Sequence, residues 1–286
     1  MNISKIKNLK ELSNQARIYS LMSIFYAGSG HPGGVLSCID LITYLYAYKF
    51  RIKKISYFNK INRNRLILSK GHSAPAIYST LAALKVLRYK DIINLRKIDS
   101  IFQGHTCRIN TPWVEASTGS LGQGFSFSIG QALTLKFLKK KGRVFSIIGD
   151  GEMQEGQVWE GLMLAAQHKL RNLVTILDYN KLQSDNFNKK IINIEPIKKK
   201  ILSFNWNVLE IDGHSFHEID KSINKNFKND KPTFIIAHTI KGKGVSFMEN
   251  KPLWHGSLKM SVDQIISSLK ELDANNKLIE ECKNYE

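Results

Sequence analysis

The chain has 286 residues, of which 43% are hydrophobic and 23% are charged, a composition typical of a globular protein with a sizeable core. No uncharged apolar run approaches about 18 residues, and the first residues are polar, so we expect neither a membrane-spanning helix nor a signal peptide. The three cysteines, Cys38, Cys107 and Cys282, form no CxxC motif, which argues against a disulfide framework or a zinc site. A reducing, cytoplasmic location is therefore expected.

The net charge is strongly positive, with 42 Lys and Arg residues against 24 Asp and Glu residues, or +18. The basic residues are scattered, with only short runs at 139–141 and 198–200, and no nucleic-acid-binding module is recognisable. We interpret the charge as a solvated basic surface that can attract anionic small molecules. Neither nucleic acid nor a membrane is expected as a partner, although a nucleic-acid-binding or regulatory protein remains the non-enzymatic alternative.

Strands and helices are predicted to alternate along the chain. A helix at 4–26 is broken by a Gly-rich segment at 28–34, and the stretch 99–124 is predicted to be mostly loop. Further helices are predicted at 36–48, from about 76 to 87, and at 125–139, 157–168, 216–224 and about 261–274, and strands at 65–69, 144–148, 173–178, 208–211 and 234–237. This order predicts one doubly wound α/β domain over residues 1–286, with a mainly parallel sheet covered by helices on both faces.

Polar segments follow three of the predicted strands, at 69–73, 149–151 and 178–182. Because ligands of parallel sheets gather at the carboxyl ends of strands, these segments are candidate site residues. Gly149-Asp150-Gly151 is followed by Asn180, 30 residues after Asp150 and at the end of the next strand. The Asp150 carboxylate, the Asn180 amide oxygen and the Leu182 carbonyl are hard oxygen ligands suited to Mg²⁺ on a diphosphate. GDG alone is more often a simple turn; the spacing to Asn180 makes the prediction specific.

The segment 148–183, IGDGEMQEGQVWEGLMLAAQHKLRNLVTILDYNKLQ, resembles the thiamine-diphosphate motif of transketolases. Four further segments resemble the same family in the same order: GSGHPGGVLSCIDL (28–41), LSKGHSAPAIYS (68–79), STGSLGQG (117–124) and IKGKGVSFMEN…WHG (240–256). The resemblance covers nearly the whole chain. It implies thiamine diphosphate as cofactor, with Mg²⁺ or another divalent cation such as Ca²⁺ or Mn²⁺, and transfer of a two-carbon ketol unit between sugar phosphates.

The resemblance also implies roles for individual residues. His72 and His255 match histidines near the diphosphate, His31 and His105 match those that handle substrate hydroxyls, and all four lie in Gly-flanked loops where imidazole could transfer protons. Together with Glu155, the histidines His31, His105 and His255 are the predicted catalytic residues. His168, His214, His217 and His238 are interpreted as structural.

Three further assignments are less direct, and the one for Gly151 comes from the residue itself rather than from the resemblance. Gly119 and Leu121 match a loop that packs against the thiazolium, although a glycine-permitted turn before a helix is the simpler interpretation. Gly151 would let its N–H approach phosphate. Glu155 is interpreted either as an acid at a helix N-terminus or as a buried glutamate that links two cofactor sites across an interface.

The sequence departs from the family pattern at Thr106, Trp113, Ser184 and Asn186, which leaves the fit of the donor sugar open. Only 30 residues follow Gly256, fewer than the roughly 50 of a small domain. We therefore expect an amino-terminal subunit that is active only with a separate carboxy-terminal subunit, two copies of each. The alternative within the same cofactor class is another reaction, such as a specialised ketol transfer or synthesis of 1-deoxyxylulose 5-phosphate.

Overall fold

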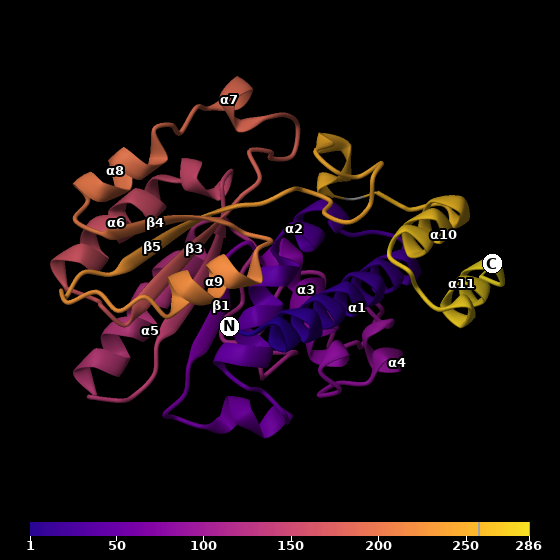
Figure 1. The fold of residues 1–286 in the computed structure, drawn as a ribbon, viewed down its shortest axis with the longest axis horizontal. Helices are drawn as coiled ribbons and strands as arrows, with labels where there is room; N and C mark the ends of the chain where they lie inside the picture. Colours follow the sequence, from indigo (N-terminus) through magenta and orange to yellow (C-terminus); the bar gives the residue numbers. More distant parts are fainter. Residues whose placement is uncertain (257, 286) are drawn as a thin grey trace.

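The computed structural model describes residues 1–256 and 258–285 and is built around a five-stranded parallel sheet (Figure 1). The strands are β1 (Arg65–Leu68), β2 (Val144–Gly149), β3 (Leu173–Tyr179), β4 (Asn207–Asp212) and β5 (Thr233–His238), in the spatial order β1-β2-β3-β5-β4. Every neighbouring pair is parallel. The predicted α/β class with a parallel sheet is confirmed.

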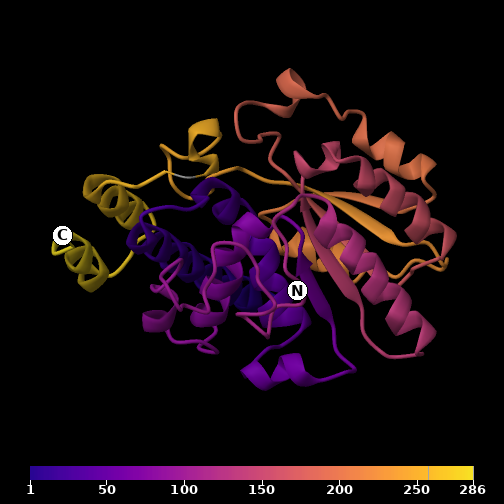
Figure 2. The ribbon, with the colours of Figure 1, turned by 180° about the vertical axis from the view of Figure 1, so that it is seen from behind.

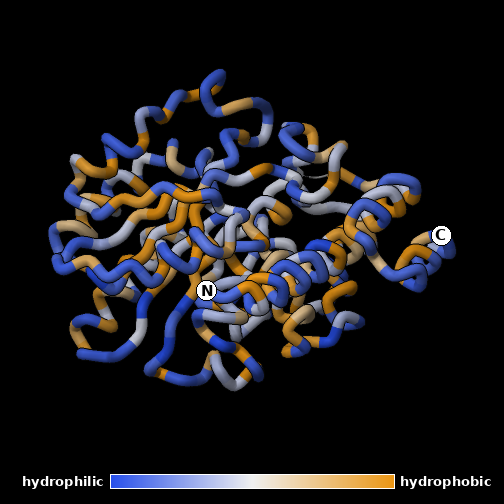
Figure 3. The backbone as a smooth tube through the Cα atoms, in the orientation of Figure 1, coloured by the Kyte–Doolittle hydropathy of each residue, from blue (hydrophilic) through white to orange (hydrophobic). Residues whose placement is uncertain are grey.

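Strand residues alternate between two hydrophobic cores, one on each face of the sheet. On β3, Val174 and Ile176 point into the first core, whereas Leu173 and Leu177 point into the second. This is the period of two expected of a strand that is buried on both faces. Figure 3 shows the consequence as nearly continuous hydrophobic colour along the central strands.

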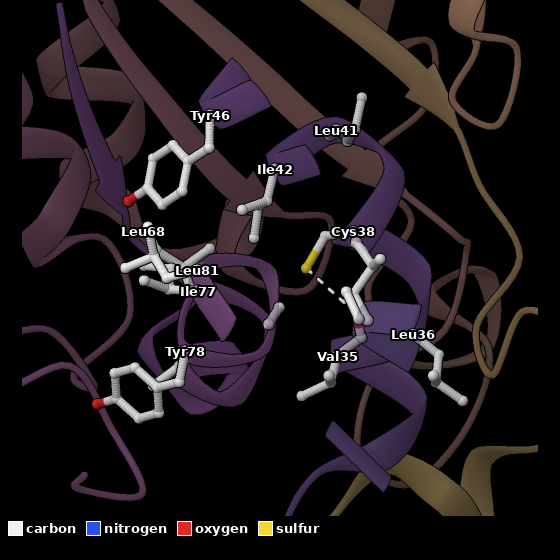
Figure 4. Close-up of a cluster of buried hydrophobic side chains, with 14 of the residues drawn as sticks. Val35, Leu36, Cys38, Leu41, Ile42, Tyr46, Leu68, Ile77, Tyr78 and Leu81 are labelled. Atoms are coloured by element: carbon white, nitrogen blue, oxygen red, sulfur yellow. Dashed lines mark hydrogen bonds between the residues drawn. The ribbon is translucent and has the colours of Figure 1, made fainter. Parts of the chain in front are cut away.

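Helices cover both faces (Figures 1 and 2). The first core is shared mainly by α1, α2, α3 and α9, and the second by α5, α6 and α8. Figure 4 shows part of the first core, where Ile42 of α2 lies close to Ile77 and Leu81 of α3. The helices are α1 (Ile3–Ala27), α2 (Pro32–Thr43), α3 (Ala74–Ala83), α4 (Tyr89–Ile92), α5 (Gln123–Phe137), α6 (Gly156–Gln167), α7 (Asn188–Ile191), α8 (Ile197–Ser203), α9 (Phe216–Ile223), α10 (Val262–Glu271) and α11 (Asn276–Lys283).

Several boundaries differ from those predicted. The segment 28–34 is only partly a break, because α2 begins at Pro32; proline suits the first helical turn, where its missing N–H needs no partner. A π-helical turn, Tyr44–Lys49, then extends α2. Helix α3 ends at Ala83 rather than near Leu87.

The prediction of a single tail helix was also incomplete. Helix α10 begins at Val262 behind a capping box formed by Ser261 and Gln264, and a second helix, α11, follows at Asn276–Lys283. The two helices lie together and pack against α1, where Asn14 donates to the Leu272 carbonyl at 2.7 Å and Cys282 contacts Met22 (Figure 1). Helix α11 buries Leu278, Ile279 and Cys282 against the first core, which explains why so polar a segment is ordered.

Candidate active site

A cavity of about 290 Å³ lies at the carboxyl ends of β1, β2 and β3. It is formed by the loops that follow these strands together with the starts of α2 and α6 and the segments around residues 105, 120, 241 and 255. All the residues predicted from the sequence line it: His31, His72, His105, Gly119, Leu121, Gly149, Asp150, Gly151, Glu155, Asn180, Leu182 and His255. The structure thus brings one set of chemically suited residues together from segments up to 224 positions apart, between His31 and His255.

Three oxygen atoms that could bind a metal lie at the ends of β2 and β3: those of the Asp150 carboxylate, the Asn180 amide and the Leu182 carbonyl. Asp150 is buried, and its carboxylate accepts the N–H of Gly151 at 2.9 Å and the N–H of Lys181. The Asn180 side-chain oxygen accepts the Leu182 N–H at 3.1 Å. Burial, followed by the negative charge of Asp178, raises the pKa of Asp150 to about 6. A cation bound here would favour the carboxylate form and offset this cost of burial.

The arrangement fits Mg²⁺ and a diphosphate. Asp150, Asn180 and the Leu182 carbonyl offer the carboxylate, amide and carbonyl oxygens that Mg²⁺ binds. Beside them, the side-chain oxygen of Gln183 is buried without a hydrogen-bond partner among the described residues. Buried polar atoms are normally paired, so an unpaired acceptor on a cavity wall indicates a place for a bound group.

Two buried lysines supply positive charge that the sequence did not single out. Lys70 Nζ donates to the Asp178 carboxylate and to the Gly34 carbonyl at 3.0 Å. Burial alone would lower the pKa of Lys70, but the charge of Asp178 outweighs it and raises the pKa. Lys241 Nζ lies 2.7 Å from His255 Nδ1, and burial, followed by the charge of Lys70, lowers the pKa of Lys241 to about 8. These ammonium groups suit a polyanionic ligand.

The four predicted histidines form one cluster. The ring centroid of His31 lies 5.1 Å from that of His72 and 5.8 Å from those of His105 and His255. Burial is the main cause that lowers all four pKa values, to about 4 for His31 and about 3 for His255. The rings are therefore neutral near pH 7, and a neutral imidazole can both donate and accept a proton. The Nδ1 atom of His31 is buried and unpaired within the described chain.

Two of the predicted glycines let other groups approach closely. A Cβ on Gly119 would lie 3.1 Å from the His105 ring, and one on Gly151 would lie 3.0 Å from the Gln183 side chain. The carbonyl of Leu121 accepts a hydrogen bond from Gln157 at 2.9 Å, which ties the loop to α6. A larger side chain at Gly119 would press against the His105 ring, and one at Gly151 would press against the Gln183 side chain.

Glu152, which sequence reasoning missed, joins three parts of the site. Its carboxylate accepts hydrogen bonds from the Ser69 hydroxyl, from the Gly122 N–H at 2.7 Å and from the Gly149 N–H at 3.0 Å. Glu152 is buried, and burial raises its pKa. The signal that could have found it is its place next to GDG, since a carboxylate there can satisfy the free N–H groups of neighbouring turns.

Glu155 lines the cavity but is exposed within this chain. It occupies the N-cap position of α6 without capping the helix through its side chain. Its position agrees with an acid beside a helix N-terminus. The second interpretation, a buried link to another cofactor site, depends on a partner chain and stays a prediction.

The four departures from the family pattern have different surroundings. Thr106 lies behind the cavity wall, 2.6 Å from the hydroxyl of Thr118. Trp113 is buried in an aromatic cluster rather than in the cavity lining. Ser184 lines the cavity directly, and the Asn186 carbonyl accepts the Gln183 N–H at 3.1 Å. Ser184 is therefore the departure that can touch a ligand.

The remaining histidines, His168, His214, His217 and His238, lie away from the described cavity lining. His214 is part of a buried network, because its Nδ1 lies 2.7 Å from Asp40 and its Nε2 accepts the Ile240 N–H at 2.9 Å. Within residues 1–256 and 258–285, no helix is long and apolar enough to cross a membrane, and no group of three or more His, Cys, Asp or Glu side chains could hold a metal ion. A metal at the cavity would depend on the amide and carbonyl oxygens as well as on Asp150.

The family of the chain follows from comparison with known protein families. The family model described as "Transketolase, thiamine diphosphate binding domain" matches residues 8–277. The chain belongs to the transketolase family. The predicted resemblance to its amino-terminal half is thereby confirmed, and so is the assignment of a thiamine-diphosphate-binding domain.

Relatives of the transketolase family fall into two lengths. The chain is 36% identical to human transketolase over 279 residues, which is 96% of this chain but only 44% of the human protein. It is 36% identical to the 6-deoxy-6-sulfo-D-fructose transketolase subunit SqwG of Clostridium sp. (strain MSTE9), covering 93% of this chain and 96% of that subunit. It is 34% identical to one of the subunits of apulose-4-phosphate transketolase from Phocaeicola vulgatus, covering 96% of this chain and 97% of that protein.

The fold is that of solved transketolases. The crystal structure of transketolase from Campylobacter jejuni aligns with a TM-score of 0.86 at 31% identity, over 96% of this chain and 44% of that one. The chain therefore spans just under half of a long transketolase and almost the whole of two proteins named as transketolase subunits.

Proposed function

We propose that this chain is the amino-terminal subunit of a two-chain transketolase, which transfers a two-carbon ketol unit from a ketose phosphate to an aldose phosphate. The observation that carries the proposal is the cavity in which three oxygen donors, two lysines and four neutral histidines meet. The near-complete coverage of two transketolase subunits supports the two-chain arrangement.

In this proposal, Asp150, Asn180 and the Leu182 carbonyl hold Mg²⁺ on the diphosphate of the cofactor. Lys70 and Lys241 add positive charge beside these oxygens, and Gly151, whose N–H is donated to Asp150, lines the same cavity. Thiamine diphosphate, when bound, supplies the electron sink for cleavage and formation of a carbon–carbon bond.

The chain's histidines would handle the protons of the substrate. Cleavage of a ketose needs a base to take a proton from the hydroxyl next to the breaking bond, and the reverse step must return it. His31 and His105 are suited to this role, because they face the cavity with depressed pKa values and are neutral near pH 7. His72 and His255, whose ring centroids lie 5.3 Å apart, would orient the diphosphate side.

A partner chain would complete the site. Apolar side chains are exposed on α5 and α6, among them Phe127, Phe137 and Met163, which supports burial of this surface in an assembly. We propose a complex of two copies of this chain with two carboxy-terminal subunits, since closed two-fold symmetry is the commonest arrangement of such assemblies.

A cytoplasmic location is part of the same proposal. It is supported by the cysteines Cys38, Cys107 and Cys282, which are free thiols in the structure.

The sugars can be those of the pentose phosphate pathway or more specialised ones. The two full-length relatives are named for a sulfo-sugar and for apulose 4-phosphate, so specialised ketol transfer is the second candidate. Ser184 is the departure placed to affect this choice, because it lines the cavity.

The test is cofactor binding followed by turnover. Thiamine diphosphate should bind the assembled complex in Mg²⁺ and be released by EDTA, as measured by isothermal titration calorimetry. The complex should then transfer ketol units among a panel of ketose and aldose phosphates and the two specialised sugars. Failure to bind the cofactor would reject the whole proposal, whereas binding without transfer to any of these sugars would reject only the reaction.

A further inference from the structure

A second cavity, of about 390 Å³, lies at the amino ends of the strands, whereas the active-site cavity lies at their carboxyl ends. Arg143 directly precedes β2, Arg171 and Asn172 precede β3, and Lys231 and Thr233 mark the start of β5. Because neighbouring strands are parallel, these residues lie together at the amino ends of the strands. A strand of six residues rises roughly 20 Å, so the two cavities are separated by about that distance.

The cavity is lined by five cationic side chains, Lys49, Arg143, Arg171, Lys225 and Lys231, and we call it the basic cavity. Four asparagines add amide groups to its wall, and none of the described Asp or Glu residues lines it. Its volume lies within the range of about 300–1,000 Å³ typical of small-molecule sites. The five cations come from four separate parts of the sequence, so no charge run marks the site.

The two innermost cations have neutral partners. Arg143 donates to the Ile223 carbonyl at 3.0 Å and lies over the Phe145 ring, 5.5 Å from its centroid. Lys49 Nζ donates to the Asn224 side-chain oxygen at 2.6 Å. Burial is the main cause that lowers the pKa of both side chains, and the proximity of other cations lowers them further. An anion would relieve this cost.

Few carboxylates are available to neutralise the cluster. In the described part of the chain, the only ion pair of these five cations joins Arg171 to Asp230 at 3.7 Å, and both side chains are more than 60% exposed. Asp220 lies near Lys49 but is engaged by Tyr44, by Asn224 and by the amino terminus. The cavity therefore keeps a large positive excess.

We propose that the basic cavity is a binding site for a small oligophosphate anion. Several cations around a cavity of this size match a ligand that carries three or more negative charges, as an oligophosphate does and a single carboxylate does not. Arginine forks and asparagine amides are the donors that recognise phosphate oxygens. The small volume of the cavity favours a compact anion over the extended backbone of a nucleic acid.

The experiment is a calorimetric titration of the full chain with tripolyphosphate in EDTA, so that no divalent cation bridges the anion to the active-site cavity. We expect one site per chain whose affinity falls as salt is raised. The double variant Arg171→Gln/Lys231→Gln should weaken binding roughly tenfold. Both side chains lie at the surface or partly exposed, so the variant should fold.

The matched control is Lys270→Gln/Lys277→Gln, which removes the same charge from exposed positions on α10 and α11 at the far end of the molecule (Figure 1). It should bind tripolyphosphate within about twofold of the unaltered chain. Lys241→Gln, which removes a cation of the active-site cavity, should also leave binding within about twofold, and this result separates the two sites. Absence of binding, an equal loss in the control, or tighter binding of a 12-nucleotide DNA strand that the same double variant weakens would each overturn the proposal.

Discussion

Replacement of Asp40 tests whether a buried ion pair holds the active-site loops in place. Its carboxylate accepts hydrogen bonds from Arg17 at 3.0 and 2.6 Å and lies 2.7 Å from His214. Arg17 also donates to the Lys243 carbonyl at 3.2 Å, and His214 accepts the Ile240 N–H. The network thus fixes both sides of the segment that carries the active-site lysine at position 241.

The change Asp40→Asn leaves the Arg17 guanidinium, which is 7% exposed, without a counter-charge. Breaking a buried pair on one side costs about 3–5 kcal/mol. With an unfolding entropy of about 2.1 cal/mol/K per residue, the 286 residues give roughly 0.6 kcal/mol/K. The midpoint of thermal unfolding should therefore fall by about 5–8 °C. Binding of thiamine diphosphate should weaken as well, because the 240–243 segment loses its support.

Denaturant unfolding of the purified chain, followed by circular dichroism, measures the loss in free energy of unfolding. Removing both charges in Arg17→Met/Asp40→Asn should recover most of the loss, since no buried charge then lacks a partner. Burial alone would raise the pKa of Asp40, but Arg17 and His214 outweigh it and hold the pKa below its usual range. The stabilisation is therefore present above about pH 4 and is lost as the pH falls further. A loss under about 1 kcal/mol, or no recovery in the double variant, would refute the reasoning.

Three further predictions concern the proposed function. Asp150→Ala and Asn180→Ala should each abolish most Mg²⁺-dependent binding of thiamine diphosphate in calorimetry, because each removes a metal ligand; unchanged affinity in both would reject the metal site. His31→Ala and His105→Ala should fold and bind cofactor but lower ketol-transfer turnover by about 100-fold or more in steady-state kinetics, and near-normal turnover in both would exclude the proton-transfer role. The isolated chain should show no ketol transfer in a coupled assay and should gain activity and thermal stability when the partner subunit is added; robust activity alone would contradict the two-chain proposal.

The fold was predictable because its strands carry a strong local signal. The runs at 144–148 and 173–178 are buried on both faces, so they form continuous apolar segments between helices. The start of α2 was less predictable, since glycines at 33 and 34 suggested a break although Pro32 begins the helix. The short helix α11 depends on packing against α1, which no local pattern reveals.

Much of the candidate site could be predicted because its residues occur in ordered motifs. Lys70, Lys241 and Glu152 lie in the same motifs, but the sequence did not reveal their roles, because their burial depends on distant groups. Lys70 lies in the polar segment 69–73 that follows the first predicted strand, but its burial follows from its pairing with Asp178, 108 positions away. The basic cavity was missed for the same reason, as its cations meet only when the sheet forms.

The three hydrogen bonds of Glu152 have a consequence for motion. One carboxylate holds the end of β1 at Ser69, the start of α5 at Gly122 and the end of β2 at Gly149. None of these loops can open alone without leaving a buried carboxylate short of a donor, so they should open as one cooperative unit. Amide protons of Gly122 and Gly149 should then exchange with deuterium at a common rate, although they lie 27 residues apart in the chain.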